Sequence, residues 1–236
     1  MKRELILFIL LLFVAGCFST TGTGSAFSDS EPYFRGGSNS SAGSDEFEGE
    51  LKWSFTLPDN EQFISSPTIS GDKIFIGGGD KGVYCLNAKD GKTVWKYATE
   101  GGVNSTPAVY NNAVYVGSED YNIYALNAKK GKLLWTYKTG GLIWSSPAVY
   151  DGVVFAGSYD YFFYALDAKT GKLLWKKSLV KAITSSPAVY DSKVYIGSRS
   201  GHLYCFDCKN GDLIWKFDAK GDVESAQYIY NGIVYF

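Results

Sequence analysis

A repeat with a period of 40 residues runs through the sequence and restricts the fold more than any other feature. The tripeptide Ser-Ser-Pro or Ser-Thr-Pro recurs at 65–67, 105–107, 145–147 and 185–187. Tryptophans recur in step, 42, 40, 40 and 40 residues apart, at Trp53, Trp95, Trp135, Trp175 and Trp215. Such periods are typical of architectures in which each unit buries its neighbour.

Each period contains four short segments with β-strand character. In one copy they cover 147–150, 153–158, 162–168 and 172–177. Asp151-Gly152 joins the first two, as in a two-residue hairpin. A glycine ends the turn between the third and fourth, at Gly91, Gly131, Gly171 and Gly211. Four antiparallel strands per period predict an all-β fold, a β-propeller of four-stranded blades.

The count of segments predicts a ring that is not closed. Residues 65–220 supply four full blades, 51–57 supply one outer strand, and 225–236 supply two inner strands. We therefore expect partial blades at both ends, from a truncated or split gene or else from an incomplete ring of five blades. Open blade edges favour self-association.

Residues 165–175 follow the pattern A-x-D-x-x-T-G-x-x-x-W, and three other copies match it closely. This segment resembles the tryptophan-docking motif of the quinoprotein, or PQQ-like, β-propeller family. The resemblance covers roughly residues 32–236. It implies a structural role for the five repeated tryptophans, each packed between blades against the motif glycine.

The first 17 residues are predicted to be a lipoprotein signal peptide. Basic residues precede an apolar run at 5–15, which is shorter than the ~20 residues of a spanning helix. Val14-Ala15-Gly16-Cys17 resembles a lipobox, which implies lipidation of Cys17. A plain secretory signal is the alternative. A Ser/Gly/Thr-rich tether follows at 18–46, and the propeller repeats occupy 47–236.

The charges and cysteines argue against nucleic-acid binding, disulfide bonds and a zinc site. With 23 basic and 24 acidic residues and no basic stripe, nucleic acid is not an expected partner. Cys85, Cys205 and Cys208 stand where other copies carry alanine, so we expect small buried side chains rather than disulfides. A zinc site with His202 is disfavoured, because Cys205 would point away from the other two side chains.

Binding residues are expected in the loops between the second and third strands and in the linkers between blades, which share one face. Trp144 is the one tryptophan outside the repeat register. It is predicted to form an aromatic binding face with nearby loop residues, namely Tyr121, Tyr159, Tyr161, Phe162, Asp120 and Asp160. Packing of these loops against one another is the alternative interpretation.

Catalysis is not expected. Quinoprotein dehydrogenases are similar in fold. By the resemblance, a member of that class would hold PQQ with a Cys-Cys pair and a Ca²⁺ site, and this sequence has no Cys-Cys pair. The sequence thus favours a non-catalytic scaffold without PQQ, anchored in an outer membrane or at the cell surface, that binds envelope or surface proteins. It resembles the propeller lipoproteins of outer-membrane barrel assembly. Part of a PQQ-dependent dehydrogenase-like enzyme is the alternative.

Overall fold

The computed structural model describes residues 51–58 and 61–236, which form five antiparallel sheets. Four sheets have four strands each and the fifth has two. Cys17, the predicted tether and the start of the propeller region at 47 lie outside the described residues. The strands are β1 (Thr68–Ser70), β2 (Lys73–Gly78), β3 (Gly82–Asn87), β4 (Thr93–Ala98), β5 (Ala108–Tyr110), β6 (Ala113–Gly117), β7 (Asn122–Asn127), β8 (Leu133–Lys138), β9 (Ala148–Tyr150), β10 (Val153–Gly157), β11 (Phe162–Asp167), β12 (Leu173–Ser178), β13 (Ala188–Tyr190), β14 (Lys193–Ser198), β15 (His202–Asp207), β16 (Leu213–Asp218), β17 (Tyr228–Tyr230) and β18 (Ile233–Tyr235).

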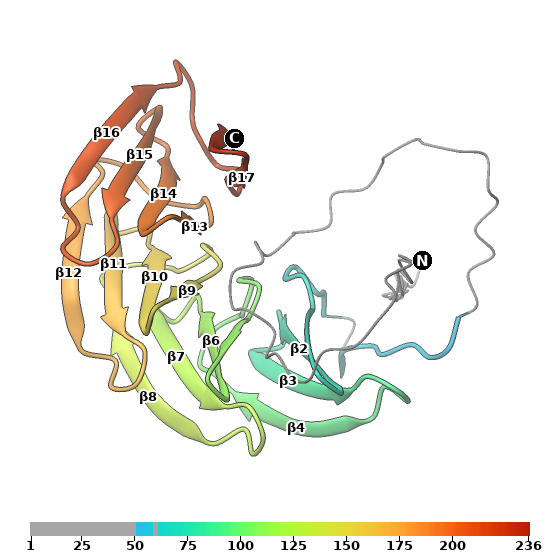
Figure 1. Ribbon diagram of the computed structural model, residues 1–236. Helices are drawn as coiled ribbons and strands as arrows, with labels where there is room; N and C mark the ends of the chain where they lie inside the picture. Colours follow the sequence, from blue (N-terminus) through green and yellow to red (C-terminus); the bar gives the residue numbers. More distant parts are fainter. Residues whose placement is uncertain (1–50, 59–60) are drawn as a thin grey trace, which may run out of the picture.

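The sheets are blades arranged side by side in an arc (Figure 1). Strand order within each blade follows the chain, with the first strand innermost and the fourth, such as β8 or β12, outermost (Figure 1). After four full blades, β17 and β18 form a partial one, and the arc of the described residues does not close. The predicted fold, an incomplete propeller of four-stranded blades, is confirmed.

Residues 51–57 are expected to form an outer strand, but they form no strand in the structure. An outer strand pairs with the third strand of its own blade, and the described residues hold no third strand beside this segment. Trp53 still contacts the first full blade, where its Nε1 donates to the carbonyl oxygen of Ala88 at 3.1 Å.

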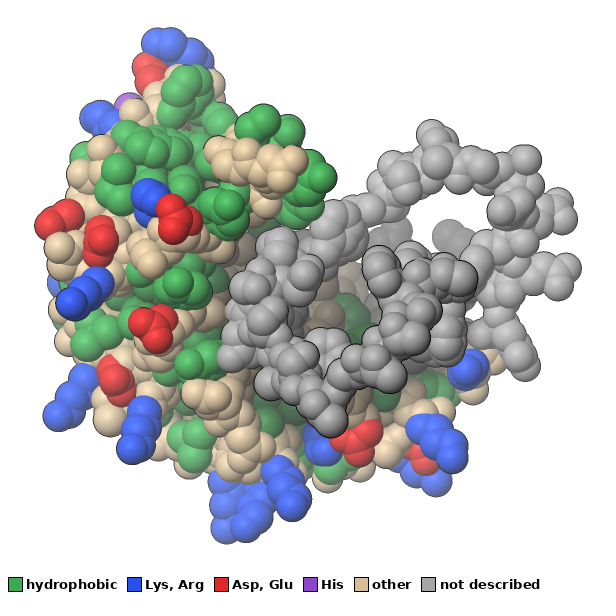
Figure 2. All heavy atoms as spheres, in the orientation of Figure 1, with side chains coloured by type: hydrophobic (Ala, Val, Ile, Leu, Met, Phe, Trp, Pro, Cys, Tyr) green, Lys and Arg blue, Asp and Glu red, His purple; other side chains and the backbone are tan. Residues whose placement is uncertain are grey.

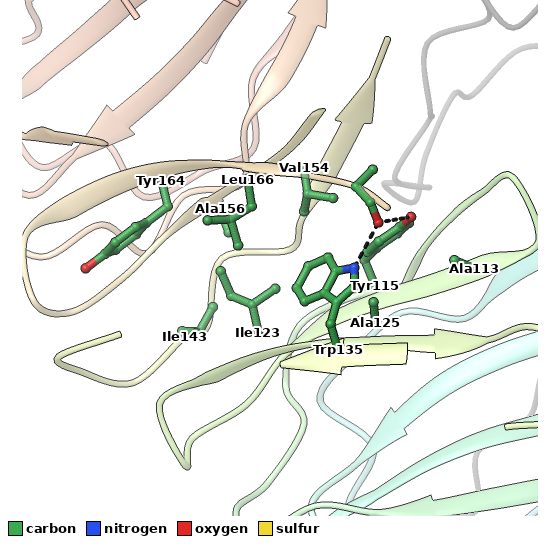
Figure 3. Close-up of a cluster of buried hydrophobic side chains, with 11 residues drawn as sticks. Ala113, Tyr115, Ile123, Ala125, Trp135, Ile143, Val154, Ala156, Tyr164 and Leu166 are labelled. Carbon is green, nitrogen blue, oxygen red and sulfur yellow. Dashed lines mark hydrogen bonds between the residues drawn. The ribbon is translucent and has the colours of Figure 1, made fainter. Parts of the chain in front are cut away.

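The repeated tryptophans join one blade to the next. Trp135 of β8 is buried, and its Nε1 donates to the carbonyl oxygen of Ala168 in the following blade at 2.9 Å. The hydroxyl of Tyr115 donates to the same oxygen at 3.0 Å (Figure 3). Around this indole, Ile123, Val154 and Leu166 fill the space between the two sheets (Figure 3). A buried Trp contributes ~4–6 kcal/mol of gross apolar burial, so these contacts hold the arc together.

The Ser-Ser-Pro repeats join the blades near the axis. Ser105 is buried, donates its hydroxyl to the carbonyl oxygen of Gly117 and accepts from the N–H of the same residue. The next residue of each repeat reaches the neighbouring blade, as when the N–H of Thr106 donates to Oγ of Ser146 at 2.9 Å. The N–H of Ser146 in turn donates to Oγ of Ser186 at 3.0 Å.

The strand ends define two faces of the arc. On what we call the turn face, the hairpin between strands one and two meets the turn between strands three and four. There the N–H of Ala168 donates to the carbonyl oxygen of Gly152 at 2.8 Å. On the loop face, the connection between strands two and three meets the linker to the next blade, and the N–H of Ile143 donates to the carbonyl oxygen of Ser118 at 3.2 Å. Among the described residues, no helix has the length and apolar character needed to cross a membrane.

Candidate functional site

Trp144 lies at the centre of a chain of contacts on the loop face. Its indole Nε1 donates to Oε1 of Glu119 at 3.0 Å, and Nδ2 of Asn104 donates to the same oxygen at 2.7 Å. The ring of Tyr159 meets the indole edge to face, with centroids 4.9 Å apart and planes inclined by 74°. Trp144 is nevertheless 38% exposed, so this side chain is held in place and open to a partner.

The chain of contacts continues toward the last blade. The guanidinium Cζ of Arg199 lies 5.5 Å from the ring centroid of Tyr159, within the range of a cation–π interaction. Arg199 also forms an ion pair with Glu224, which raises the pKa of the guanidinium further. Burial raises the pKa of the Tyr159 phenol, so burial favours its neutral form. We call Glu119, Trp144, Tyr159, Arg199 and Glu224 the rim network.

The rim network carries both signs of charge around two aromatic rings. On the face in Figure 2, acidic side chains are scattered among hydrophobic ones, and many Lys and Arg side chains extend from the outer edge of the arc. Aromatic rings with adjacent charges are typical of protein-binding surfaces, where Trp, Tyr and Arg supply much of the binding energy.

Asp120 and Asp160, predicted to border this site, have structural partners. Oδ2 of Asp160 accepts hydrogen bonds from the Tyr164 hydroxyl at 2.6 Å and from the N–H of Gly140 at 2.7 Å. Asp120 accepts in the same way from Tyr124 at 2.7 Å and from the N–H of Glu100 at 2.9 Å. Each carboxylate thus ties its loop to a strand and to the preceding linker.

The other predicted aromatics have contacts of their own. Tyr121 and Tyr161 are exposed at turn positions with φ of 75°. Their carbonyl oxygens accept from the N–H groups of Thr139 and Leu179, at the end of each outer strand. Phe162 faces its own blade, with Nζ of Lys176 4.3 Å from the ring centroid. Of the predicted set, the structure brings together Trp144 and Tyr159.

Sequence reasoning missed Glu119, Arg199 and Glu224. The signal was present in the aligned repeats. The third residue of the loop after the second strand reads Gly79, Glu119, Tyr159 and Arg199, and the residue before each Ser-Ser-Pro slot reads Ile64, Asn104, Trp144, Thr184 and Glu224. These two positions differ from copy to copy, and the fold places them in alternation along the loop face.

The described cysteines are buried side chains. Cys85, Cys205 and Cys208 are free and buried. Burial raises the pKa of Cys85 to about 11 and of Cys208 to about 12, so neither is a reactive thiolate at neutral pH. In the part of the chain that the structure describes, no three His, Cys, Asp or Glu side chains are grouped as a metal site requires.

A family model described as "Beta-alanine-activating enzyme, beta-propeller" matches residues 37–235. The chain belongs to this β-propeller family. One curated relative of this propeller is the polyvinylalcohol dehydrogenase of Sphingopyxis sp. (strain 113P3). It is 35% identical over 57 residues, which are 24% of this chain and 8% of that protein.

Solved structures with the same fold include proteins of different kinds. BamB from Moraxella catarrhalis is 25% identical, with a TM-score of 0.61 over 72% of this chain and 55% of that one. The quinohemoprotein alcohol dehydrogenase ADHIIG from Pseudomonas putida HK5 is 18% identical, with a TM-score of 0.57 over 72% of this chain and 37% of that one. The propeller thus spans about half the length of BamB and less of the dehydrogenases.

Proposed function

We propose that this propeller is a non-catalytic scaffold that binds another protein through the rim network on its loop face. The observation that carries the proposal is the geometry of Trp144, which is exposed yet held by Glu119 on one side and Tyr159 on the other. An aromatic side chain fixed in advance loses little conformational entropy on binding. Arg199 and Glu119 supply opposite charges for orienting the partner.

The proposed location is the cell envelope, with the chain anchored through an acyl group on Cys17. The support is the apolar run at 5–15 followed by Val14-Ala15-Gly16-Cys17, together with the likeness to BamB. Membrane fractionation of wild type and Cys17→Ser tests the anchor. The variant should stay unprocessed or leave the membrane fraction, and identical migration and fractionation would contradict the anchor.

Affinity capture from envelope extracts tests the binding face. Wild type should retain a discrete partner that Trp144→Ala and Arg199→Glu lose. Tyr161→Ala is the matched control, because Tyr161 is an exposed aromatic of the same face outside the rim network. If Tyr161→Ala loses the partner and the two rim variants keep it, the site is misassigned.

A dehydrogenase-like activity is the second candidate, favoured by the local identity with polyvinylalcohol dehydrogenase. We propose that the chain does not bind PQQ, because no two of its cysteines are adjacent and the three described ones are buried. Purified protein should show no PQQ- and Ca²⁺-dependent reduction of an electron-accepting dye. Saturable activity on an alcohol substrate would favour the enzyme instead.

A further inference from the structure

Exposed hydrophobic side chains concentrate on the turn face. Each outer strand begins there, immediately after the tight turn that contains the repeated glycine. Its first two positions carry exposed aliphatic side chains, except for Thr93 at the start of β4. The exposed fractions are 40–52% for Val94 in the first blade, then Leu133 and Leu134, Leu173 and Leu174, and Leu213 and Ile214.

These aliphatic residues lie beside a shift in strand register that all four blades share. In β8, Leu133 pairs with Leu126 and Trp135 pairs with Ala125, so Leu134 is the extra residue of a bulge. The other outer strands shift at the same place. A bulge redirects side chains and bends the strand. Because the exposure recurs in each blade at the same height, it forms a band around the arc, which we call the aliphatic band.

Tyrosines lie on the same face nearer the axis. Tyr150, Tyr190 and Tyr230 end the innermost strands β9, β13 and β17, directly before the hairpin turns. They are 36%, 49% and 58% exposed. Tyrosine has an apolar ring and a polar hydroxyl, so it suits a boundary between an apolar layer and water.

Lysines lie in the turns of the same face. The turns of the turn face hold ten Lys and seven Asp, a net charge of +3. These turns are 70–73, 87–92, 110–113, 127–132, 150–153, 167–172, 190–193, 207–212 and 230–233. The turn 127–132 contributes three of these lysines and no acid, and Lys129, Lys130 and Lys132 are all exposed. By contrast, the loops and linkers of the loop face hold four basic and seven acidic residues, a net charge of −3. They are 79–81, 99–104, 117–121, 139–144, 157–161, 179–184, 197–201 and 219–224.

We propose that the turn face docks on a lipid bilayer that contains anionic headgroups. The aliphatic band would enter the boundary between headgroups and acyl chains, the tyrosines would lie among the headgroups, and the lysines would pair with lipid phosphates. The acidic loop face would then point away from the membrane. This proposal is independent of the rim network, which lies on the opposite face.

A bilayer fits these features better than a protein partner does. Protein interfaces are depleted in lysine and concentrate their binding energy in a few central anchors. Here the same aliphatic and basic side chains recur at one height in successive blades, which suits a broad, flat and laterally uniform surface. A peptide that pairs with an exposed outer strand is the competing occupant, and the test separates the two.

The test measures which face of the full chain vesicles cover. Lysine acylation is quantified by peptide mass spectrometry on vesicles of phosphatidylcholine with and without phosphatidylglycerol. Lys129, Lys130 and Lys132 should be protected from acylation on the anionic vesicles only, since bound lipid phosphates would shield their amines. Lys181 and Lys220 of the loop face should react equally on both. The readout concerns the covered face, so binding through the N-terminal segment does not imitate it.

Two variants and a control complete the test. A quadruple variant with Leu133, Leu134, Leu173 and Leu174 each changed to Ser should fold, because these side chains are exposed, and should lose the protection. A second variant, Lys129→Glu with Lys130→Glu and Lys132→Glu, should weaken binding to anionic vesicles by about a hundredfold relative to neutral ones. Val180→Ser, an exposed aliphatic of the loop face, should change nothing. Protection of the loop face, equal protection on neutral vesicles, or no protection of the turn face on anionic vesicles, as expected for a peptide partner, would overturn the proposal.

Discussion

The indole of Trp135 rests on Gly171 of the next blade so closely that a β-carbon on Gly171 would lie 2.6 Å from Cδ2 of the indole. Gly171 also has a φ of 72°, which L residues with a side chain rarely adopt. The same contact joins Trp53 with Gly91, Trp95 with Gly131 and Trp175 with Gly211. The glycine of the turn is thus required twice, for its backbone conformation and for the approach of the ring.

Gly171→Ala should therefore lower the free energy of unfolding by about 3 kcal/mol or more, combining left-handed strain of about 1–2 kcal/mol with displacement of the indole. Gly152→Ala is the matched control, since its φ is 74° and a β-carbon there would meet no atom within 4 Å. It should show the strain alone. Urea denaturation followed by circular dichroism measures both, and equal losses would contradict the packing role of Gly171.

Trp135 and Trp144 should respond differently to the same substitution. Trp135→Ala should destabilise the propeller by about 3–5 kcal/mol, because it empties a buried site between two blades. Trp144→Ala should cost less than about 1 kcal/mol, because Trp144 is already 38% exposed, whereas Trp135 is 8% exposed. Thermal denaturation compares the two, and a similar loss of melting temperature would show that Trp144 serves packing.

Asp120 should make stability depend on pH in the acidic range. Burial alone would raise the pKa of its carboxyl, but hydrogen bonds from Tyr124, Asn122 and the N–H of Glu100 outweigh burial and lower it. Folding thus favours the ionised form of Asp120. The stabilisation from this carboxylate is present above the unfolded pKa of about 3.9 and is lost as the pH falls through the folded pKa.

Asp120→Asn should accordingly cost about 1–2 kcal/mol at pH 7, and the difference from wild type should shrink as the pH falls below ~4. Chemical denaturation at a series of pH values measures this difference. Asp151→Asn, in an exposed hairpin turn, serves as the control and should follow wild type throughout. A difference between Asp120→Asn and wild type that stays constant with pH would contradict the role given to the charge.

The open end of the arc should promote self-association of the 236-residue chain. Trp215 is 37% exposed, whereas the equivalent Trp135 and Trp175 are 8% exposed, and Phe217 beside it is 54% exposed. Light scattering should detect oligomers that grow with concentration, and Phe217→Lys should shift the distribution toward monomer. Tyr161→Lys on the loop face should leave it unchanged. A wild type that stays monomeric at all concentrations would contradict this prediction.

Much of the fold follows from the sequence because each repeat encodes its own local geometry. The predicted segments 147–150, 153–158, 162–168 and 172–177 match β9 to β12 to within a residue or two at their ends. Alternation of apolar side chains, an Asp-Gly hairpin and a glycine with positive φ are local requirements, so they can be recognised residue by residue. The strand expected at 51–57 is absent because strand formation also requires a neighbouring strand.

Only the tertiary structure assembled the candidate site. Glu119 and Trp144 are 25 residues apart in sequence, and Tyr159 and Arg199 are 40 apart, yet they meet because successive blades stack. Within single blades, the loop geometry placed Asp160 at the Tyr164 hydroxyl, and the pairing of β7 with β8 left Leu133 and Leu134 exposed together at a bulge. Sequence periodicity specifies which face of a strand is apolar. Which side chains of different blades come within a few ångströms depends on the distance and angle between sheets, and these arise only when the blades pack against one another.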